Sequence, residues 1–516
     1  MRHLLAQVDP GLPIEELEAA ELITPNIDWY AVSVHLILMV GGVLVLTVAS
    51  LWRKHPDWFA PMATVAIAVA GFVMAVFQWQ TLDTDGPRSV IAGAVALDGF
   101  SIYLSGVMCA ALVLIAPLLA GYLDREDLVS TEPYVLMLLS ASGGTVMAAA
   151  NDLVVLFVGL EILSIAVYVL AAMHRRRARS QEAGLKYFVL GAFSSAFFLY
   201  GMAFIYGATS STSLVDINAF LARNTLLDDR FLLAGMALML VGFGFKVAAV
   251  PFHSWTPDVY QGAPSPVSAF MASVVKAAAF AGLLRVFYVT FGGYAADWQP
   301  VIYALSIASL VVGSVMALVQ TDVKRLLAYS SITHAGFLLV GVETATERGT
   351  AAVLFYLLCY TFMVIGSFAA ATLIGRAGDG HHSLEDLKGL SRTHPALAML
   401  FTVFLLAQAG IPLTSGFVAK FYVIGAAVEA EEYPLAAIAM LAAVVGVFLY
   451  LRIIVGMYFD GETYGEDLPA NPARLNLPMP SMLMLGAAVI ITVLIGVVPG
   501  PVIDVARDAV PVLVAG

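Results

Sequence analysis

The chain has 516 residues, of which 60% are hydrophobic and only 12% are charged, whereas soluble domains carry about a quarter charged residues. This composition excludes an ordinary water-soluble domain, and the net charge of −12 excludes a strongly basic nucleic-acid-binding protein. The two cysteines, Cys109 and Cys359, are too few for a zinc site or an iron–sulfur cluster, each of which takes about four ligands.

Apolar stretches long enough to cross a bilayer follow one another along the chain. A crossing helix takes about 20 residues, and an open strand cannot satisfy its backbone inside lipid. The sequence therefore predicts an all-α polytopic membrane protein with about 14 transmembrane helices. Their expected ranges are 29–51, 60–79, 97–121, 132–149, 152–171, 184–207, 231–250, 266–290, 300–319, 324–342, 350–374, 396–427, 434–458 and 481–504.

The expected helices divide the chain into five parts. These are an N-terminal extracytoplasmic segment (1–28), helices one to three (29–121), two groups of five helices (132–290 and 300–458), and the last helix with the tail (481–516). The N-terminal segment lacks the long apolar stretch of a cleavable signal peptide, so we expect the first span to be retained.

The basic residues of the loops predict the orientation in the membrane. Most loop Lys and Arg residues lie on one side of the expected spans, and HRRRAR (174–179) is the densest run. Loops rich in Lys and Arg face the cytoplasm. We therefore expect both termini to lie outside the cell.

Two expected spans contain residues that interrupt helices. The seventh runs into Pro251, and the twelfth contains Gly410, Pro412 and Gly416. Proline removes a backbone hydrogen bond and clashes with the preceding turn, which frees carbonyl groups nearby. Both spans are therefore expected to be broken helices.

A faint internal repeat links the two groups of five helices. NDLVVLFVGLEILSIAVYVL (151–170) aligns with TDVKRLLAYSSITHAGFLLV (321–340). The first segment is expected to start outside and the second inside, so the repeat would be inverted. Inverted repeats are typical of transporters, whose sites lie near the midplane in broken helices.

After the loop residues are assigned, four basic residues remain within the spans, Lys246, Lys276, Arg285 and Lys420, and one acid, Glu161, lies near the middle of the fifth span. A charge at the bilayer centre costs on the order of 3 kcal/mol or more, so such residues face the protein interior. Lysine can exchange a proton there, while arginine stays charged. We therefore predict that the acid and the three lysines form a proton relay and that Arg285 is structural. A single snorkelling lysine or a static ion pair is the alternative.

Further polar residues lie at or near these spans. His334 and His253 are candidate relay groups because histidine titrates near neutral pH, although His253 is as well explained as a hydrogen-bonding loop residue. Asp152 and Asp322 are expected to cap helices. Gln408, beside the second break, either binds water or bridges helices.

Motifs for a resident cofactor are absent from the sequence. It contains no Walker A motif, no GxGxxG with an acidic partner and no CxxC, and His381 with His382 is too little for a metal site. We therefore expect no metal, nucleotide or redox group in this chain. Energy for transport would come from a partner or from another ion gradient.

Five blocks of the sequence resemble the antiporter-like membrane subunits of the proton-pumping NADH–quinone oxidoreductase, respiratory complex I. The resemblance covers roughly residues 130–460, and LKYF with LGAFSSAFFLYG favours subunit N over subunits L and M. The blocks are NDLVVLFVGLEILSIAVYVLAA, RSQEAGLKYFVLGAFSSAFFLYG, GFGFKVAAVPFHSWTPDVYQGAPSPVSAFMASVVKAAAF, TDVKRLLAYSSITHAGF and AGIPLTSGFVAKFYV.

The resemblance implies two inverted five-helix repeats with broken seventh and twelfth helices. It also implies that Glu161 and Lys246 form a pair that breaks and re-forms, that Lys276 is the central relay, and that Lys420 is the exit-side lysine. Quinone reduction elsewhere in the complex would drive these charge changes.

The resemblance further implies partners and location. The partners would be subunit M, the small subunits K and J, and the lipid bilayer of a bacterial inner membrane, with no nucleic acid. FMN, iron–sulfur clusters and quinone would belong to other parts of the complex. The alternatives are a subunit of a multisubunit Na+/H+ antiporter, a subunit of a related F420H2- or ferredoxin-driven complex, and a passive scaffold.

Overall fold

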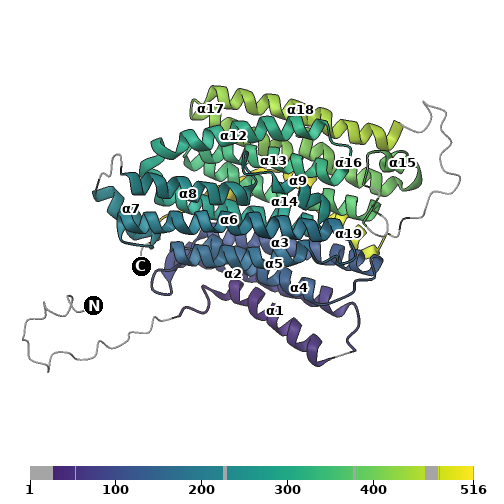
Figure 1. Ribbon diagram of the computed structural model, residues 1–516, viewed down its shortest axis with the longest axis horizontal. Coiled ribbons are helices and arrows are strands. Elements are labelled where there is room, and N and C mark those ends of the chain that lie inside the picture. The colour runs from purple at the N-terminus through teal and green to yellow at the C-terminus, as the bar shows by residue number, and fades with distance from the viewer. Residues whose placement is uncertain are drawn as a thin grey trace, which may run out of the picture.

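The structure, a computed structural model, shows long helices that run side by side in one bundle (Figure 1). The N-terminal helices lie at one flank, and α17 and α18 lie at the other. The predicted N-terminal segment 1–28 lies almost entirely outside the described residues. The structure describes residues 27–52, 54–224, 229–375, 379–380, 382–459, 475 and 477–514.

The described residues are almost all helical, with one short antiparallel hairpin that the sequence did not predict. In chain order the elements are α1 (Ser33–Leu51), α2 (Phe59–Asp85), β1 (Arg88–Val90), β2 (Val95–Leu97), α3 (Gly99–Arg125), α4 (Glu132–Ala149), α5 (Leu153–Ala171), α6 (Ala178–Thr209), α7 (Leu214–Arg223), α8 (Arg230–Val247), α9 (Trp255–Gly262), α10 (Ser265–Phe270), η2 (Met271–Val275), α11 (Lys276–Leu283), η3 (Leu284–Thr290), η4 (Gly292–Tyr294), α12 (Ala295–Leu318), α13 (Val323–Glu343), α14 (Glu347–Ile374), η5 (Glu385–Leu387), α15 (Leu390–Thr393), α16 (Pro395–Ala409), α17 (Ser415–Glu429), α18 (Tyr433–Phe459), α19 (Met479–Val497) and α20 (Gly500–Asp508).

Twelve helices in the described ranges are long and apolar enough to cross a membrane, or up to 13 if the bent pair of α15 and α16 is one span. This confirms the prediction of an all-α polytopic membrane protein, but the expected fourteen spans are not confirmed. Helix α4 is not among the twelve, since its 18 residues include the polar first turn with Glu132 as well as Ser140, Ser142 and Thr145. Helices α16 and α17, which the sequence joined into one span, have 15 residues each.

Both predicted helix breaks are present. Helix α8 ends at Val247, and Ala248 turns into the left-handed region with a φ of 63° before the chain passes Pro251. Helix α16 ends at Gly410, where φ is 87°, a conformation that glycine adopts without strain. Each break leaves carbonyl groups at the end of a half-helix without their usual helical partners.

Helices α5 and α13 begin in the same way. Asp152 accepts hydrogen bonds from the first turn of α5, and Asp322 does the same for α13, which confirms both as helix caps. Each aspartate also forms an isolated antiparallel bridge, Asp152 with Ser213 and Asp322 with Ser383. This likeness agrees with the alignment of the two segments, whereas the inverted relation and the domain boundaries remain predictions.

The centre of the bundle consists of α13, α14 and the helical segment Ser265–Thr290. The most apolar windows of these three are 100%, 94% and 100% buried, against 28% for α2 and for α18. Helices at the flanks therefore present apolar side chains outward, as expected for a surface in lipid. The residues discussed next lie on or against the buried central helices.

Candidate functional site

The three predicted lysines are buried within the protein and do not face lipid. The exposed fractions of Lys246, Lys276 and Lys420 are 4%, 2% and 7%. Glu161 is partly buried, and its Oε1 atom has no hydrogen-bond partner. Because burying an ammonium group is costly, the surrounding groups must satisfy each lysine.

Lys246 lies two residues before the first break and is bound to α5. Its Nζ donates to Ser164 Oγ at 2.7 Å and to Tyr168 OH at 3.2 Å. Ser164 follows Glu161 by three residues, so both lie on the same face of α5. Glu161 and Lys246 themselves form no ion pair within 4.0 Å among the described residues. The hydroxyl of Ser164 binds the lysine instead.

Lys276 lies at the centre of the bundle, directly after the π-helix η2. Its Nζ donates to the backbone oxygen of Ser331 at 2.6 Å and contacts Ser331 Oγ at 2.5 Å. The ring of Tyr360 lies 5.4 Å from the same nitrogen. π-Helical turns are rare and occur frequently at functional sites. Lys276 is thus held against α13 by two oxygen acceptors and an aromatic face.

His334 lies one turn beyond Ser331 on α13, between two tyrosine hydroxyls. Its Nδ1 is 2.7 Å from Tyr356 OH, and its Nε2 is 3.3 Å from Tyr450 OH. In a neutral imidazole one nitrogen donates and the other accepts. His334 is therefore positioned to take a proton from one hydroxyl and give a proton to the other.

Gln408 connects four helices near the second break. Its Oε1 accepts from Ser330 Oγ at 3.2 Å and from Tyr450 OH at 3.4 Å. Its Nε2 donates to Ser367 Oγ, and Ser330 Oγ also contacts Tyr450 OH. Of the two interpretations that the sequence left open, helix bridging is what the contacts show.

Lys420 occupies the second break itself. Its Nζ donates to the backbone oxygens of Gln408 at 2.7 Å and of Ala409 at 3.0 Å, the carbonyl groups at the end of α16. A Cβ atom at Gly410 would lie 3.0 Å from Lys420 Cδ, so the lysine would have to shift, and the φ of 87° independently favours glycine.

A line of polar contacts thus joins His334, Tyr450 and the side chain of Gln408, whose backbone oxygen in turn accepts from Lys420. His334 lies one turn from Ser331, the partner of Lys276. The other predicted residues are less connected. Lys246 lies beside the rings of Tyr168, Tyr187 and Phe245, and no hydrogen bond between described residues joins it to Lys276. His253 lies in the turn after the first break, and its Nδ1 has no hydrogen-bond partner.

The structure adds residues that the sequence reasoning missed. Tyr450 was missed because it lies in an uninterrupted apolar run, whereas Ser330 and Ser331, one turn before His334, were a usable signal. Arg285 fits the structural role expected of it, because its NH2 lies 2.7 Å from Asp98 Oδ1 and both side chains are buried.

A cavity of about 760 Å³ lies at the ends of α4, α5 and α6 and extends to Tyr168, the partner of Lys246. Its lining includes Glu132, Arg175 and Gln181 as well as apolar groups such as Phe188. Tyr168 therefore contacts both this cavity and Lys246.

Comparison with known proteins identifies the family. Residues 150–446 match the family model described as "NADH:quinone oxidoreductase/Mrp antiporter, TM". The NADH-quinone oxidoreductase subunit N of Parafrankia sp. is 43% identical over 530 residues, covering 95% of this chain and 97% of the relative. The chain belongs to the subunit N family. This confirms the resemblance found in the sequence.

Solved structures agree with membership of the subunit N family. A chain of respiratory complex I from Thermus thermophilus is 33% identical with a TM-score of 0.76, covering 92% of this chain and 99% of that one. A chain of the Mrp complex from Dietzia sp. is 20% identical with a TM-score of 0.79, covering 93% and 97%. The Mrp likeness shows a shared fold alone. Among the four residues of the line of polar contacts, His334, Tyr450, Gln408 and Lys420, only Tyr450 lies beyond the matched region 150–446.

The contact at Tyr450 gives a first prediction. Tyr450→Phe removes the hydroxyl that joins His334 to Gln408 while keeping the ring. If protons follow this line, proton transport falls about tenfold, a modest loss for one proton-transfer group, with assembly unchanged. Vesicle acidification by the assembled complex measures this. Normal transport in Tyr450→Phe would exclude the tyrosine from the path.

Proposed function

We propose that this chain is a proton-translocating membrane-arm subunit of an NADH–quinone oxidoreductase (complex I). Glu161, Lys246, Lys276 and Lys420 relay the protons, with His334 between the last two, and quinone reduction in other subunits supplies the energy. The observation that carries the proposal is the line of polar contacts from His334 to Lys420, which begins one turn from Ser331, the buried partner of Lys276. Family membership supports the same assignment.

The chemistry of the line suits proton transfer. The Tyr450 hydroxyl both donates and accepts, so it can pass a proton between His334 and the hydroxyl of Ser330 by rotating, while Gln408 orients both hydroxyls. The carbonyl groups of the broken α16 bind the ammonium form of Lys420, as carbonyls at broken helices bind cations in transporters. A proton arriving there is held before its release.

At the Glu161 end of the relay, the charge of the carboxylate controls whether Lys246 holds or releases its proton. The carboxylate of Glu161, one turn from Ser164, attracts the protonated form of the lysine, and loss of that negative charge favours proton release. The cavity that extends to Tyr168 is the uptake route to Lys246 in this proposal. His253, in the turn beyond the break, is a candidate group at the same end of the relay.

The proposal includes orientation, architecture and partners. The end of the bundle with the 174–179 run faces the cytoplasm of a bacterial inner membrane, with both termini outside. Spans four to eight and nine to thirteen form inverted repeats, which the matching starts of α5 and α13 support. Subunits M, K and J cover part of the exposed apolar flanks, and FMN, iron–sulfur clusters and quinone are held by other subunits.

Lys246→Met tests the proposal directly. In membrane vesicles that contain the assembled complex, we expect NADH-driven acidification to fall about 100-fold, because the relay loses the lysine on which the charge of Glu161 acts. Acidification by the unmodified complex should be the same with and without sodium. A sodium requirement would favour the Na+/H+ antiporter, and normal pumping by an assembled Lys246→Met complex would favour the passive scaffold.

A further inference from the structure

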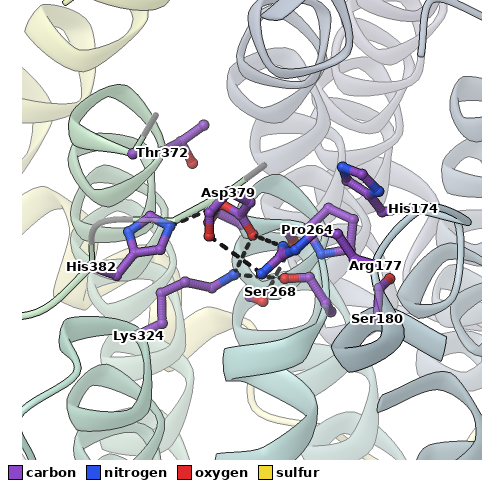
Figure 2. Close-up of polar contacts among 12 residues, drawn as sticks. His174, Arg177, Ser180, Pro264, Ser268, Lys324, Thr372, Asp379 and His382 are labelled. Atoms are coloured by element: carbon purple, nitrogen blue, oxygen red, sulfur yellow. Dashed lines mark hydrogen bonds and ion pairs between the residues drawn. The ribbon is translucent and has the colours of Figure 1, made fainter. Parts of the chain in front are cut away.

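A buried carboxylate lies at the end of the bundle that carries the 174–179 run. Asp379 belongs to the loop after α14, and only 2% of the residue is exposed (Figure 2). Its Oδ2 lies 2.6 Å from Arg177 NH1 and 2.9 Å from Lys324 Nζ. Its Oδ1 lies 2.9 Å from His382 Nε2 and accepts from Ser265 Oγ at 3.1 Å. Four segments therefore meet at one side chain.

Further charged side chains lie beyond these four partners and connect Asp379 to α3. Arg125 NH2 lies 4.0 Å from Asp379 Oδ1, and Arg125 Nε binds Glu126 at 2.9 Å. Glu126 in turn lies 3.4 Å from His174. Arg125 NH1 also donates to the backbone oxygens of Thr372 and Gly375, at the end of α14. The loop that carries Asp379 is thereby fixed to α3.

The carboxylate stays ionised at any physiological pH. Burial alone would raise the pKa of Asp379, but Lys324, His382 and Arg177 outweigh burial and hold the pKa well below its ordinary value of 3.8. The stabilisation is therefore fully present above that ordinary value and is lost only as the pH falls through the lower pKa of the folded protein.

Asp379 joins the first turns of two central helices. Ser265 is the first residue of α10, and Lys324 is the second residue of α13. Lys324 Nζ also donates to the backbone oxygen of Ala263, just before α10, at 2.7 Å. The starts of α10 and α13 are thus tied together by Asp379 and Lys324.

The contact between Lys276 and Ser331 lies farther along the same two helical segments. Lys276 lies eleven residues beyond Ser265, about 16 Å along the helical segment, and Ser331 lies seven residues beyond Lys324, about 10 Å along α13. Lys276 Nζ and Ser331 meet there at 2.6 and 2.5 Å. A shift of one helix start relative to the other therefore changes this contact directly.

We propose that Asp379 is a positioning residue for the proton relay: it fixes the start of α10 against the start of α13, so that Lys276 stays within hydrogen-bond distance of Ser331. This inference rests on the proposed function and adds a residue that lies outside the relay. Asp379 does not touch the relay groups and acts through Lys324 and Ser265.

Asp379→Asn tests this inference, because asparagine keeps the shape and loses the charge. In vesicles that contain the complete complex, protons pumped per NADH oxidised should fall about tenfold, as small misplacements of a reacting group produce. The loss should be equal at pH 6 and pH 8, because Asp379 is ionised at both. A merely structural role would lower the amount of complex but leave the protons per NADH unchanged.

Asp258→Asn is the matched control. Asp258 binds Lys186 at 2.8 Å and Arg325 at 2.6 Å, so it also contacts the start of α13 through an ion pair, but α10 is not involved. Protons per NADH should stay at the wild-type value. Asp379→Glu, which keeps the charge, should recover part of the pumping lost in Asp379→Asn.

If Asp379→Asn does not assemble, Ser265→Ala provides the test, because it removes only the link to α10 and should lower protons per NADH in the same direction. Normal values in every assembled variant would overturn the inference, as would an equal loss in the Asp258→Asn control.

Lys276→Met, measured in parallel, separates the positioning role of Asp379 from the proposed function. Normal pumping in Lys276→Met overturns the proposed function, whereas its loss together with normal Asp379→Asn overturns only the positioning role.

Discussion

Lys276→Met should abolish proton pumping, with a loss of about 100-fold or more, while the complex still assembles. Methionine has a similar length and needs no hydrogen-bond partners, so it fits a site in which only 2% of the lysine is exposed. The variant removes the ammonium group that donates to Ser331. Acidification of vesicles, divided by the NADH oxidised, is the measurement.

Lys54→Met is the control for this prediction. Lys54 is an exposed lysine between α1 and α2, far along the chain from the relay, and its loss should leave pumping unchanged. Wild-type pumping by an assembled Lys276→Met complex would contradict the central role of the lysine.

Arg285→Met should instead prevent assembly. It leaves Asp98 charged and buried without its partner, which costs about 3–5 kcal/mol, comparable to much of the stability of a domain. Asp98→Asn combined with Arg285→Met should recover assembly, because asparagine still caps α3 and carries no charge. The amount of assembled complex and its thermal unfolding midpoint measure both effects.

If Arg285→Met still assembles, Arg285 could instead be a group of the proton relay. An Arg285→Met complex with wild-type stability that fails to pump would mean that the ion pair serves transport. Arg285 and Lys276 thus differ in what their loss removes, which is assembly for the arginine and pumping for the lysine.

The helices and breaks could be predicted because lipid leaves the backbone few choices. A long apolar run must be a helix, and the breaks fall where Pro251 lacks a backbone N–H and where Gly410 allows a positive φ. The number of spans could not be predicted in the same way, because α4 combines a polar first turn with small polar residues and α16 and α17 have only 15 residues each.

The relay lysines could also be predicted, because a charge within an apolar run is costly in lipid and therefore faces the protein interior. Their partners could not, because they come from segments distant in the sequence. Tyr450 looks apolar in its run, and Asp379 looks like a solvated loop acid, yet the fold buries both. Arg177 belongs to the basic run that predicts the orientation in the membrane. In the structure it binds Asp379, as does Lys324.

The gap between Lys246 and Lys276 bears on how well an idle complex retains the ion gradient it has built. Aromatic rings surround the first lysine, and no hydrogen bond between described residues joins it to the second. Apolar side chains in this stretch would slow a proton that moves back without a driving change in charge. The stretch would then limit proton leakage through an idle complex, while a change in charge at Glu161 still drives forward transfer.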